Sequence, residues 1–269
     1  MARSAVVGRE VLRDGTRELD QLAVEEPLEI RLAGDTLAIT MRTPGDDASL
    51  AVGYLFAEGV VTSLADVGSV AHCGRPGDDG YGNVIEVTPG PGARIDPSRL
   101  DGTRRASVTS SACGICGRRS IDDLLERIPS APRQAYLRRS IVAESPSILA
   151  RSQEHFRTTG GLHASAALDH DGNVIAAAED VGRHNALDKV VGMLLYASRL
   201  DDAALMVVSG RVGFEIVQKV AVARIPVLAA VGAPTSLAVE LAERGGITLA
   251  AFVRDARFNV YAHPERVIG

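Results

Sequence analysis

The segment Cys113-Gly114-Ile115-Cys116 has the clearest capacity for chemistry in this 269-residue sequence. Two cysteines at this spacing can form a small-ring disulfide, share a metal ion, or let one thiol resolve a reaction that the other has begun. A zinc site needs about four ligands, and the rest of the sequence offers Cys73 and scattered histidines without a second pair. A thioredoxin-like dithiol stands where a strand opens a helix, whereas this pair lies in a segment of little periodicity.

The residues around the cysteine pair favour a third kind of chemistry, in which a thiolate carries sulfur as a persulfide. Gly114 and Gly117 let backbone N–H groups approach the sulfur, and Arg118 and Arg119 add positive charge. Both features favour the nucleophilic thiolate over the thiol. On the residues alone, structural zinc, dithiol exchange and sulfur transfer all stay open.

A second group of polar residues flanks the expected strands of the second half of the chain. Residues 179–185 include Arg183 and His184, and His163 follows two glycines at the start of another expected strand. Small residues occupy the equivalent places after the next two strands, at 209–211 and 232–236. Ligands of open α/β sheets bind at the carboxyl ends of strands, and N–H groups at helix starts bind anions. We therefore expect a ligand site there, with solvated turns as the alternative.

The last expected strand is followed by Arg254-Asp255-Ala256-Arg257-Phe258-Asn259. Two arginines, an acid and an amide can bind phosphates and the hydrogen-bonding edge of a base such as guanine. A solvated charged tail is the other interpretation. These residues alone favour neither.

The elements that must position these residues change in character near residue 100. Residues 1–100 predict a smaller β-rich part, with a hairpin at 28–42, a helix at 48–58 that Asp46 and Asp47 can cap, and a strand at 83–88. Residues 101–269 alternate helices and apolar strands, which predicts an α/β domain with a mostly parallel sheet. The expected helices are 121–128, 148–155, 185–198, 214–224 and 234–244. The expected strands are 163–168, 174–178, 205–208, 227–231 and 248–253.

Composition and charge argue against several functional classes. The formal net charge is −5, so the chain lacks the basic field with which proteins bind nucleic acid non-specifically. The sequence has no apolar run long enough to cross a membrane and no signal-peptide core near its start. Three cysteines do not suggest a secreted protein held by disulfides. We therefore expect a cytoplasmic protein that binds neither nucleic acid nor membrane.

Taken together, these residues resemble the formate dehydrogenase accessory sulfurtransferase family (FdhD) along nearly the whole chain. Several of the matching strings are long and ungapped, so the resemblance is far more specific than a bare Cys-x-x-Cys. The matching strings are residues 41–47, 113–117, 160–163, 179–189, 209–211, 234–238 and 252–254.

The resemblance implies a sulfurtransferase with a cysteine persulfide intermediate. Such a protein takes sulfur from a cysteine desulfurase and passes it to the molybdenum or tungsten of a bis-molybdopterin guanine dinucleotide cofactor, for a client formate dehydrogenase. Carried over to this sequence, Cys113 is the persulfide carrier and Cys116 its helper. The cofactor is a bound acceptor, and no permanently bound metal is expected. With the strand-end argument above, the residues expected to bind the cofactor are Phe252, Val253, Arg254, Asp255, Ala256, Arg257, His163, Arg183 and His184.

The resemblance also implies a homodimer and a three-layer α/β/α core like that of cytidine deaminases. Zinc deaminases require a His-x-Glu sequence and a Pro-Cys-x-x-Cys sequence. Here Ala164 and Ser165 follow His163, and Ala112 precedes Cys113, so the catalytic glutamate is missing. Deamination is therefore not the expected activity, and the cysteine pair is left for sulfur chemistry.

Overall fold

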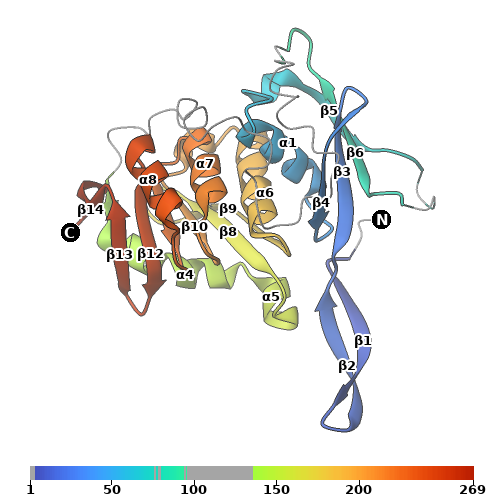
Figure 1. Cartoon of the computed structure of the whole chain (residues 1–269), viewed down its shortest axis with the longest axis horizontal. Coiled ribbons are helices and arrows are strands. Elements are labelled where there is room, and N and C mark those ends of the chain that lie inside the picture. Colours follow the sequence, from blue (N-terminus) through green and yellow to red (C-terminus); the bar gives the residue numbers. More distant parts are fainter. Residues whose placement is uncertain (1–3, 76, 78–79, 94, 96–135) are drawn as a thin grey trace.

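An antiparallel ribbon opens the part of the chain that the computed structural model describes, which comprises residues 4–75, 77, 80–93, 95 and 136–269. The ribbon consists of β1 (Val6–Arg13) and β2 (Thr16–Ala23) and projects from the rest of the molecule (Figure 1). Leu12 and Leu19 on it are 71% and 68% exposed. Because the residues of the ribbon are exposed or only partly buried, its sequence lacks the regular apolar alternation that predicts a half-buried strand.

A four-stranded sheet in the order β4-β3-β6-β5 forms the body of the N-terminal part. Its strands are β3 (Glu26–Leu32), β4 (Asp35–Arg42), β5 (Val67–His72) and β6 (Val84–Pro89), and helix α1 (Asp47–Ala57) follows β4. The predicted hairpin is confirmed, with its turn at Ala33 and Gly34. Both turn residues have a left-handed backbone, at φ 52° and 87°, which is the geometry that a two-residue hairpin turn needs to match the strand twist.

A six-stranded sheet in the order β13-β12-β11-β10-β8-β9 forms the second half. Its strands are β8 (His163–Leu168), β9 (Val174–Asp180), β10 (Leu205–Val208), β11 (Val227–Ala230), β12 (Thr248–Arg254) and β13 (Arg257–Ala262). Among its described pairs, β10 with β11 and β11 with β12 are parallel, and the others are antiparallel. The sheet is therefore mixed, and the prediction of a mostly parallel sheet is wrong in this respect. Short turns close β8–β9 and β12–β13, and a short turn can only join antiparallel strands.

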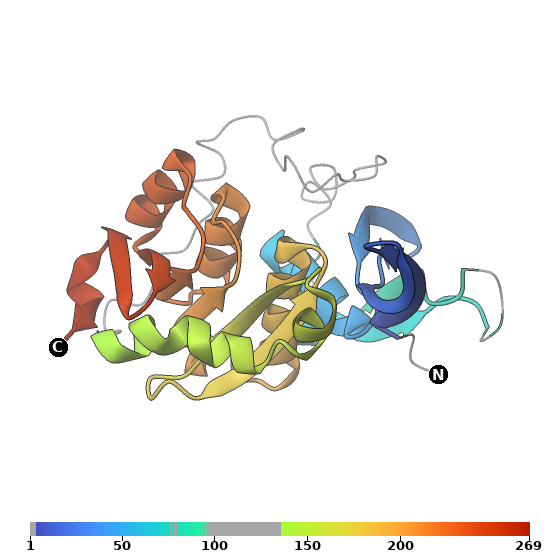
Figure 2. The same ribbon diagram turned by 90° about the horizontal axis from the view of Figure 1, so that it is seen from below.

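Helices cover both faces of this sheet (Figures 1 and 2). The described helices of the second half are α4 (Arg139–Arg151), α5 (Glu154–Thr159), α6 (Arg183–Tyr196), α7 (Phe214–Val222) and α8 (Ser236–Gly245). Strand β10 shows the layering directly. Met206 and Val208 lie in the core cluster that contains α6, α7 and α8, whereas Leu205 and Val207 lie in the cluster that contains α4. This alternation confirms the three-layer α/β/α arrangement, while the closer likeness to cytidine deaminases stays a prediction.

The predicted helix at 148–155 is divided between α4, which already begins at Arg139 and ends at Arg151, and α5, which begins at Glu154. Helix α4 contains Pro146. Proline has no N–H to donate to the carbonyl four residues before it, so it normally ends a helix. Here the Ser145 hydroxyl donates a hydrogen bond of 2.8 Å to the carbonyl of Val142, the acceptor that Pro146 leaves without its usual donor. That bond, together with the buried face of Ile141, Val142 and Leu149, keeps the helix continuous.

Helices α1 and α6 pack backbone against backbone and join the two halves of the chain. A Cβ atom at Gly53 would lie 1.9 Å from the carbonyl oxygen of Asp188, and one at Gly192 would lie 2.0 Å from that of Ser49. Only glycine fits at such distances. One core cluster accordingly contains residues of both halves. The predicted boundary near residue 100 and the predicted helix at 121–128 lie outside the described residues and stay predictions.

Two further strands close the C-terminal end. Strand β7 (Leu137–Arg138) pairs in parallel with β14 (Val267–Ile268). No helix among the described residues is long and apolar enough to cross a membrane.

Candidate functional site

The strand ends that the sequence singles out meet at one edge of the six-stranded sheet. His163 pairs with Asp180, and Val208 pairs with Ser165 on one side and Ala230 on the other. The turns after β9, β10 and β11 therefore gather beside the start of β8. The segment Phe252 to Arg257 forms the turn between β12 and β13, and this turn lies at the same edge of the sheet.

Backbone contacts tie these turns together. The N–H of Gly232 donates a hydrogen bond of 3.2 Å to the carbonyl of Gly210, and the N–H of Phe252 donates one of 3.4 Å to the carbonyl of Gly232. A Cβ atom at Gly210 would lie 3.2 Å from His163 Nδ1 and 3.6 Å from Arg183 Cδ. A continuous line of contacts thus runs from Phe252 to Arg183 across the strand ends.

Positive groups crowd this edge. Burial lowers the pKa of His163, and the charges of Arg183 and Arg211 lower it further against the opposing pull of Asp180. Burial and the charge of Arg211 likewise lower the pKa of Arg183, against the opposing pull of Glu215. Arginine side chains gathered beside a histidine in this way can bind an anion. The sequence-based list of binding residues omits Arg211, although its place after a buried strand was a usable signal.

His184 is the most buried member of this group. Burial lowers its pKa to about 3, with Arg183, Lys219 and His163 acting in the same direction. Its Nε2 atom lies 3.4 Å from a carboxylate oxygen of Glu215. At that pKa the imidazole is neutral near pH 7, so the contact joins a neutral ring to a carboxylate and is not an ion pair.

The His184→Gln variant is expected to lose less stability in mild acid than the unsubstituted protein. In the unfolded chain a histidine takes up a proton near pH 6.5, but folded His184 does not until about pH 3. The unfolded state therefore binds more protons, and stability is lost as the pH falls below about 6.5. Between about pH 7.5 and about pH 5.5 the unsubstituted protein should lose about 1.4 kcal/mol more than the variant. Urea unfolding at both pH values measures this, and equal losses would contradict it.

Most of the 179–189 string holds the edge in place and does not face the site. Glu179 accepts hydrogen bonds of 2.9 and 2.7 Å from the N–H groups of His155 and Phe156 at the start of α5. Asp180 is fully buried and lies 2.8 Å from Lys189 Nζ. Asn185 donates hydrogen bonds to Asp180 and to the carbonyl of Met41. Of this string, Arg183 remains the clearest candidate to meet a ligand.

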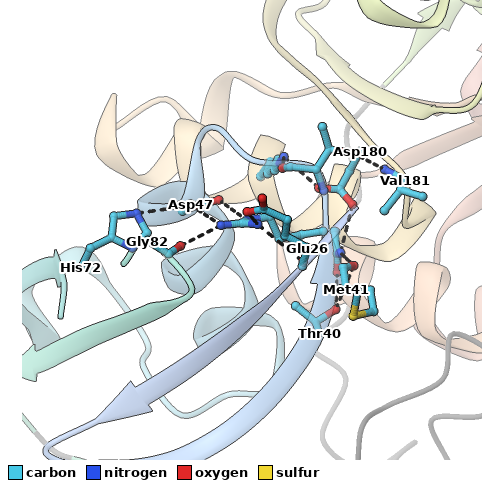
Figure 3. Close-up of polar contacts among 12 residues, drawn as sticks. Glu26, Thr40, Met41, Asp47, His72, Gly82, Asp180 and Val181 are labelled. Carbon is cyan, nitrogen blue, oxygen red and sulfur yellow. Dashed lines mark hydrogen bonds and ion pairs between the residues drawn. The ribbon is translucent and has the colours of Figure 1, made fainter. Parts of the chain in front are cut away.

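A buried polar network holds the N-terminal sheet against the same edge (Figure 3). Asp180 accepts a hydrogen bond of 3.1 Å from the N–H of Thr43. Arg42 is fully buried and donates hydrogen bonds of 2.9 and 3.1 Å to Asp47, which also lies 3.2 Å from His72 Nε2. The predicted capping of α1 is therefore wrong in detail. Asp46 holds the N-cap position without a side-chain cap bond, and Asp47 neutralises Arg42.

The segment Phe252 to Arg257 bulges from the sheet edge with its side chains mostly outward. Phe252, Asp255 and Ala256 have positive φ angles of 53°, 51° and 58°, a conformation that costs about 1 to 2 kcal/mol for residues with a Cβ. Phe252 is 40% exposed, and Arg254 and Arg257 are exposed too. Val253 is fully buried in the α4 cluster, so only its backbone can meet a ligand. Strain of this kind concentrates at binding sites.

Cys113 and Cys116 lie outside the described residues. Cys73, to which no role is assigned, is partly buried at the end of β5, and its N–H donates to the carbonyl of Val84. Within the described ranges, no three His, Cys, Asp or Glu side chains are grouped to hold a metal ion.

The profile of the FdhD/NarQ family matches residues 23–268. The sulfur carrier protein FdhD of Anaeromyxobacter dehalogenans is 56% identical over 270 residues, covering 98% of this chain and 94% of that protein. The sulfur carrier protein FdhD of Mycobacterium tuberculosis is 46% identical over 257 residues, covering 92% of each. A solved structure from Desulfotalea psychrophila, of a protein proposed to be a formate dehydrogenase accessory protein, has a TM-score of 0.73 at 25% identity and covers 98% of both chains.

Proposed function

This chain belongs to the FdhD/NarQ family, and on that premise we propose that it is a sulfur carrier that serves a formate dehydrogenase. Its sulfur comes from a cysteine desulfurase and is held as a persulfide on Cys113. The acceptor is the molybdenum or tungsten centre of a bis-molybdopterin guanine dinucleotide cofactor. The protein acts in the cytoplasm as a homodimer.

The first half of the proposed reaction is a displacement by a thiolate. The Cys113 thiolate attacks the outer sulfur of the desulfurase persulfide, a sulfur–sulfur bond forms on Cys113, and the desulfurase cysteine leaves as a thiolate. The step needs neither an oxidant nor a reductant, because sulfur moves from one thiolate to another. Cys116 is the helper thiol, three positions further along the chain.

One observation carries the acceptor half of the proposal. The exposed, strained segment Phe252 to Arg257 lies at the same sheet edge as Arg183 and Arg211, connected through the backbones of Gly232 and Gly210. Arginine side chains bind phosphate oxygens and the edge of guanine through paired N–H groups. This edge therefore suits the guanine nucleotide arm of the cofactor.

The proposal is tested by intact-mass measurement after incubation with a cysteine desulfurase and free cysteine. The protein is expected to gain the mass of one sulfur atom, and a thiol reductant should remove it. A protein that binds the cofactor without gaining sulfur would be a cofactor chaperone, and the sulfur-carrier proposal would then fail.

The Arg254→Ala variant is expected to bind guanosine diphosphate about tenfold more weakly or worse, because a hydrogen bond to a charged group contributes about 1.5 to 3 kcal/mol. Arg254 is exposed, so the substitution removes little packing. Isothermal titration measures the affinity. Arg224→Ala, at an exposed arginine that follows α7, is the matched control and should bind normally. An unchanged affinity of Arg254→Ala would remove this residue from the site.

A further inference from the structure

A cavity of about 380 Å³ lies in the N-terminal part of the molecule, between the start of α1 and the four-stranded sheet. Its volume falls within the range of about 300 to 1,000 Å³ that is usual for small-ligand sites. Three segments form its walls: the turn from β4 into α1, strand β5, and the turn that leads into β6. The cavity is therefore separate from the strand-end edge of the six-stranded sheet.

A buried network holds the polar wall of this cavity in place (Figure 3). Arg42 donates hydrogen bonds of 2.9 and 3.1 Å to Asp47 and one of 2.8 Å to the carbonyl of Gly82, and both of these residues line the cavity. The Nε2 atom of His72 lies 3.2 Å from Asp47, and its Nδ1 atom lies 3.3 Å from the carbonyl of Val84. Because each ring nitrogen already faces an acceptor, His72 serves as a wall and has no nitrogen left to hold a ligand.

Asp46 is the lining residue whose charge this network leaves unmatched. Its side chain is exposed and makes no hydrogen bond or ion pair within the described part of the chain. An N-cap residue normally has an extended backbone and accepts a hydrogen bond from the helix start, but Asp46 has a left-handed backbone, at φ 55°, and no such bond. The charge of Asp47 is matched by Arg42. The lining therefore offers a carboxylate to a ligand.

The rest of the lining is mainly apolar. Val70 and Ile85 contribute aliphatic side chains from the sheet, and Tyr81 contributes an aromatic ring whose centroid lies 6.2 Å from that of His72. Apolar walls accept the methylene stem of a long polar group, and the face of an aromatic ring attracts a cation. An anion would instead be repelled by Asp46. These walls suit a group with an alkyl stem and a positively charged end.

We propose that this cavity binds the ammonium or guanidinium end of an alkyl chain, as carried by a lysine or arginine side chain of a partner protein. Strand β5 supports the protein source, because it is the edge strand of its sheet and an edge can accept an extended segment. Residues 70–72 of β5 line the cavity, and an added strand would direct alternate side chains towards that face. This inference does not depend on the proposed function.

The test is an NMR titration of the full chain, which follows the methyl signals of Val70 and Ile85. It is run at pH 8, where histidine side chains are ordinarily neutral. The probes are n-butylammonium, its neutral analogue n-butanol, and the blocked tripeptide acetyl-Ala-Lys-Ala-amide. We expect butylammonium to bind more tightly than butanol, and the tripeptide to bind more tightly than butylammonium, because its backbone can pair with β5.

The Asp46→Asn variant should bind both cationic probes about fivefold more weakly and butanol equally well. Asparagine has nearly the same shape as aspartate and tolerates a left-handed backbone, so the substitution removes the charge alone. Asp14→Asn is the matched control. Asp14 is also an exposed aspartate with a left-handed backbone, at φ 50°, and its substitution should change none of the three affinities.

Each result decides a part of the inference. Butanol that binds as tightly as butylammonium, or an Asp46→Asn variant that keeps the full affinity for both cations, overturns the cation site. An equal loss in Asp14→Asn also overturns it, because the effect would then come from overall charge. A tripeptide that binds no more tightly than butylammonium overturns the protein partner and leaves a free amine as the ligand. If no probe shifts the methyl signals, the whole inference fails.

Discussion

The Cys113→Ala variant is expected to gain no sulfur when it is incubated with a cysteine desulfurase and cysteine. A persulfide needs a thiolate to form on, and alanine has none. The loss should therefore be complete, with the intact mass unchanged where the unsubstituted protein gains one sulfur atom. Cys113 lies outside the described part of the chain. Its assignment as the sulfur carrier is therefore tested by this experiment.

The other two cysteines provide the controls. Cys73→Ala should load normally, because this residue is partly buried beside β6 and no role is assigned to it. Cys116→Ala should still accept sulfur on Cys113 but pass it on less well. If Cys116→Ala abolishes loading while Cys113→Ala does not, the roles of the two thiols are reversed. If each single variant loads fully, neither cysteine of the pair is the sole carrier.

The Lys219→Met variant is expected to lose about 3 to 5 kcal/mol of its free energy of unfolding. Lys219 Nζ lies 2.7 and 2.8 Å from the two carboxylate oxygens of Asp188, and both side chains are buried between α6 and α7. Burial already raises the pKa of Asp188 to about 6, against the opposing pull of Lys219. Without the lysine, the carboxyl group remains buried with no charge partner in α7.

A double variant distinguishes this cost from ordinary loss of packing. Asp188→Leu combined with Lys219→Met replaces both charges with apolar groups of similar size, and most of the lost stability should return, because a buried pair often contributes little beyond its own desolvation. Urea unfolding of the single and double variants gives the comparison. If the double variant is no more stable than Lys219→Met, the cost comes from packing around the lysine stem, including its contact with the Tyr54 ring.

The convergence of the strand-end turns could be predicted from the sequence, because neighbouring strands that run the same way must end at one edge. The alternation of short apolar runs with amphipathic helices predicted α6, α7, α8 and the strands beside them, with boundaries close to those of the structure. Those elements are specified by local patterns of burial, and local patterns can be recognised in a sequence.

Features that depend on distant partners could not be predicted. Nothing next to Arg42 in the sequence indicates that it will be fully buried among Asp47, Glu26 and the carbonyl of Gly82. Pro146 indicates a helix end, and only the hydroxyl of Ser145 on the carbonyl of Val142 explains why the helix continues. The β1–β2 ribbon was not predicted for a different reason, since its residues are exposed or only partly buried and leave no apolar pattern in the sequence.

The contact between the two halves also affects how the chain is made. The hydrogen bond from Thr43 to Asp180 joins residues that are 137 positions apart in the sequence. Helix α1 packs against α6 through the close contacts at Gly53 and Gly192. During synthesis at about 5 to 20 residues per second, roughly 7 to 30 seconds pass between the emergence of the first partner and the second. Throughout that interval Leu50, Leu55 and Val52, which are buried in the finished molecule, stand uncovered on the nascent chain. The N-terminal half therefore keeps apolar surface exposed until the second half has been synthesised.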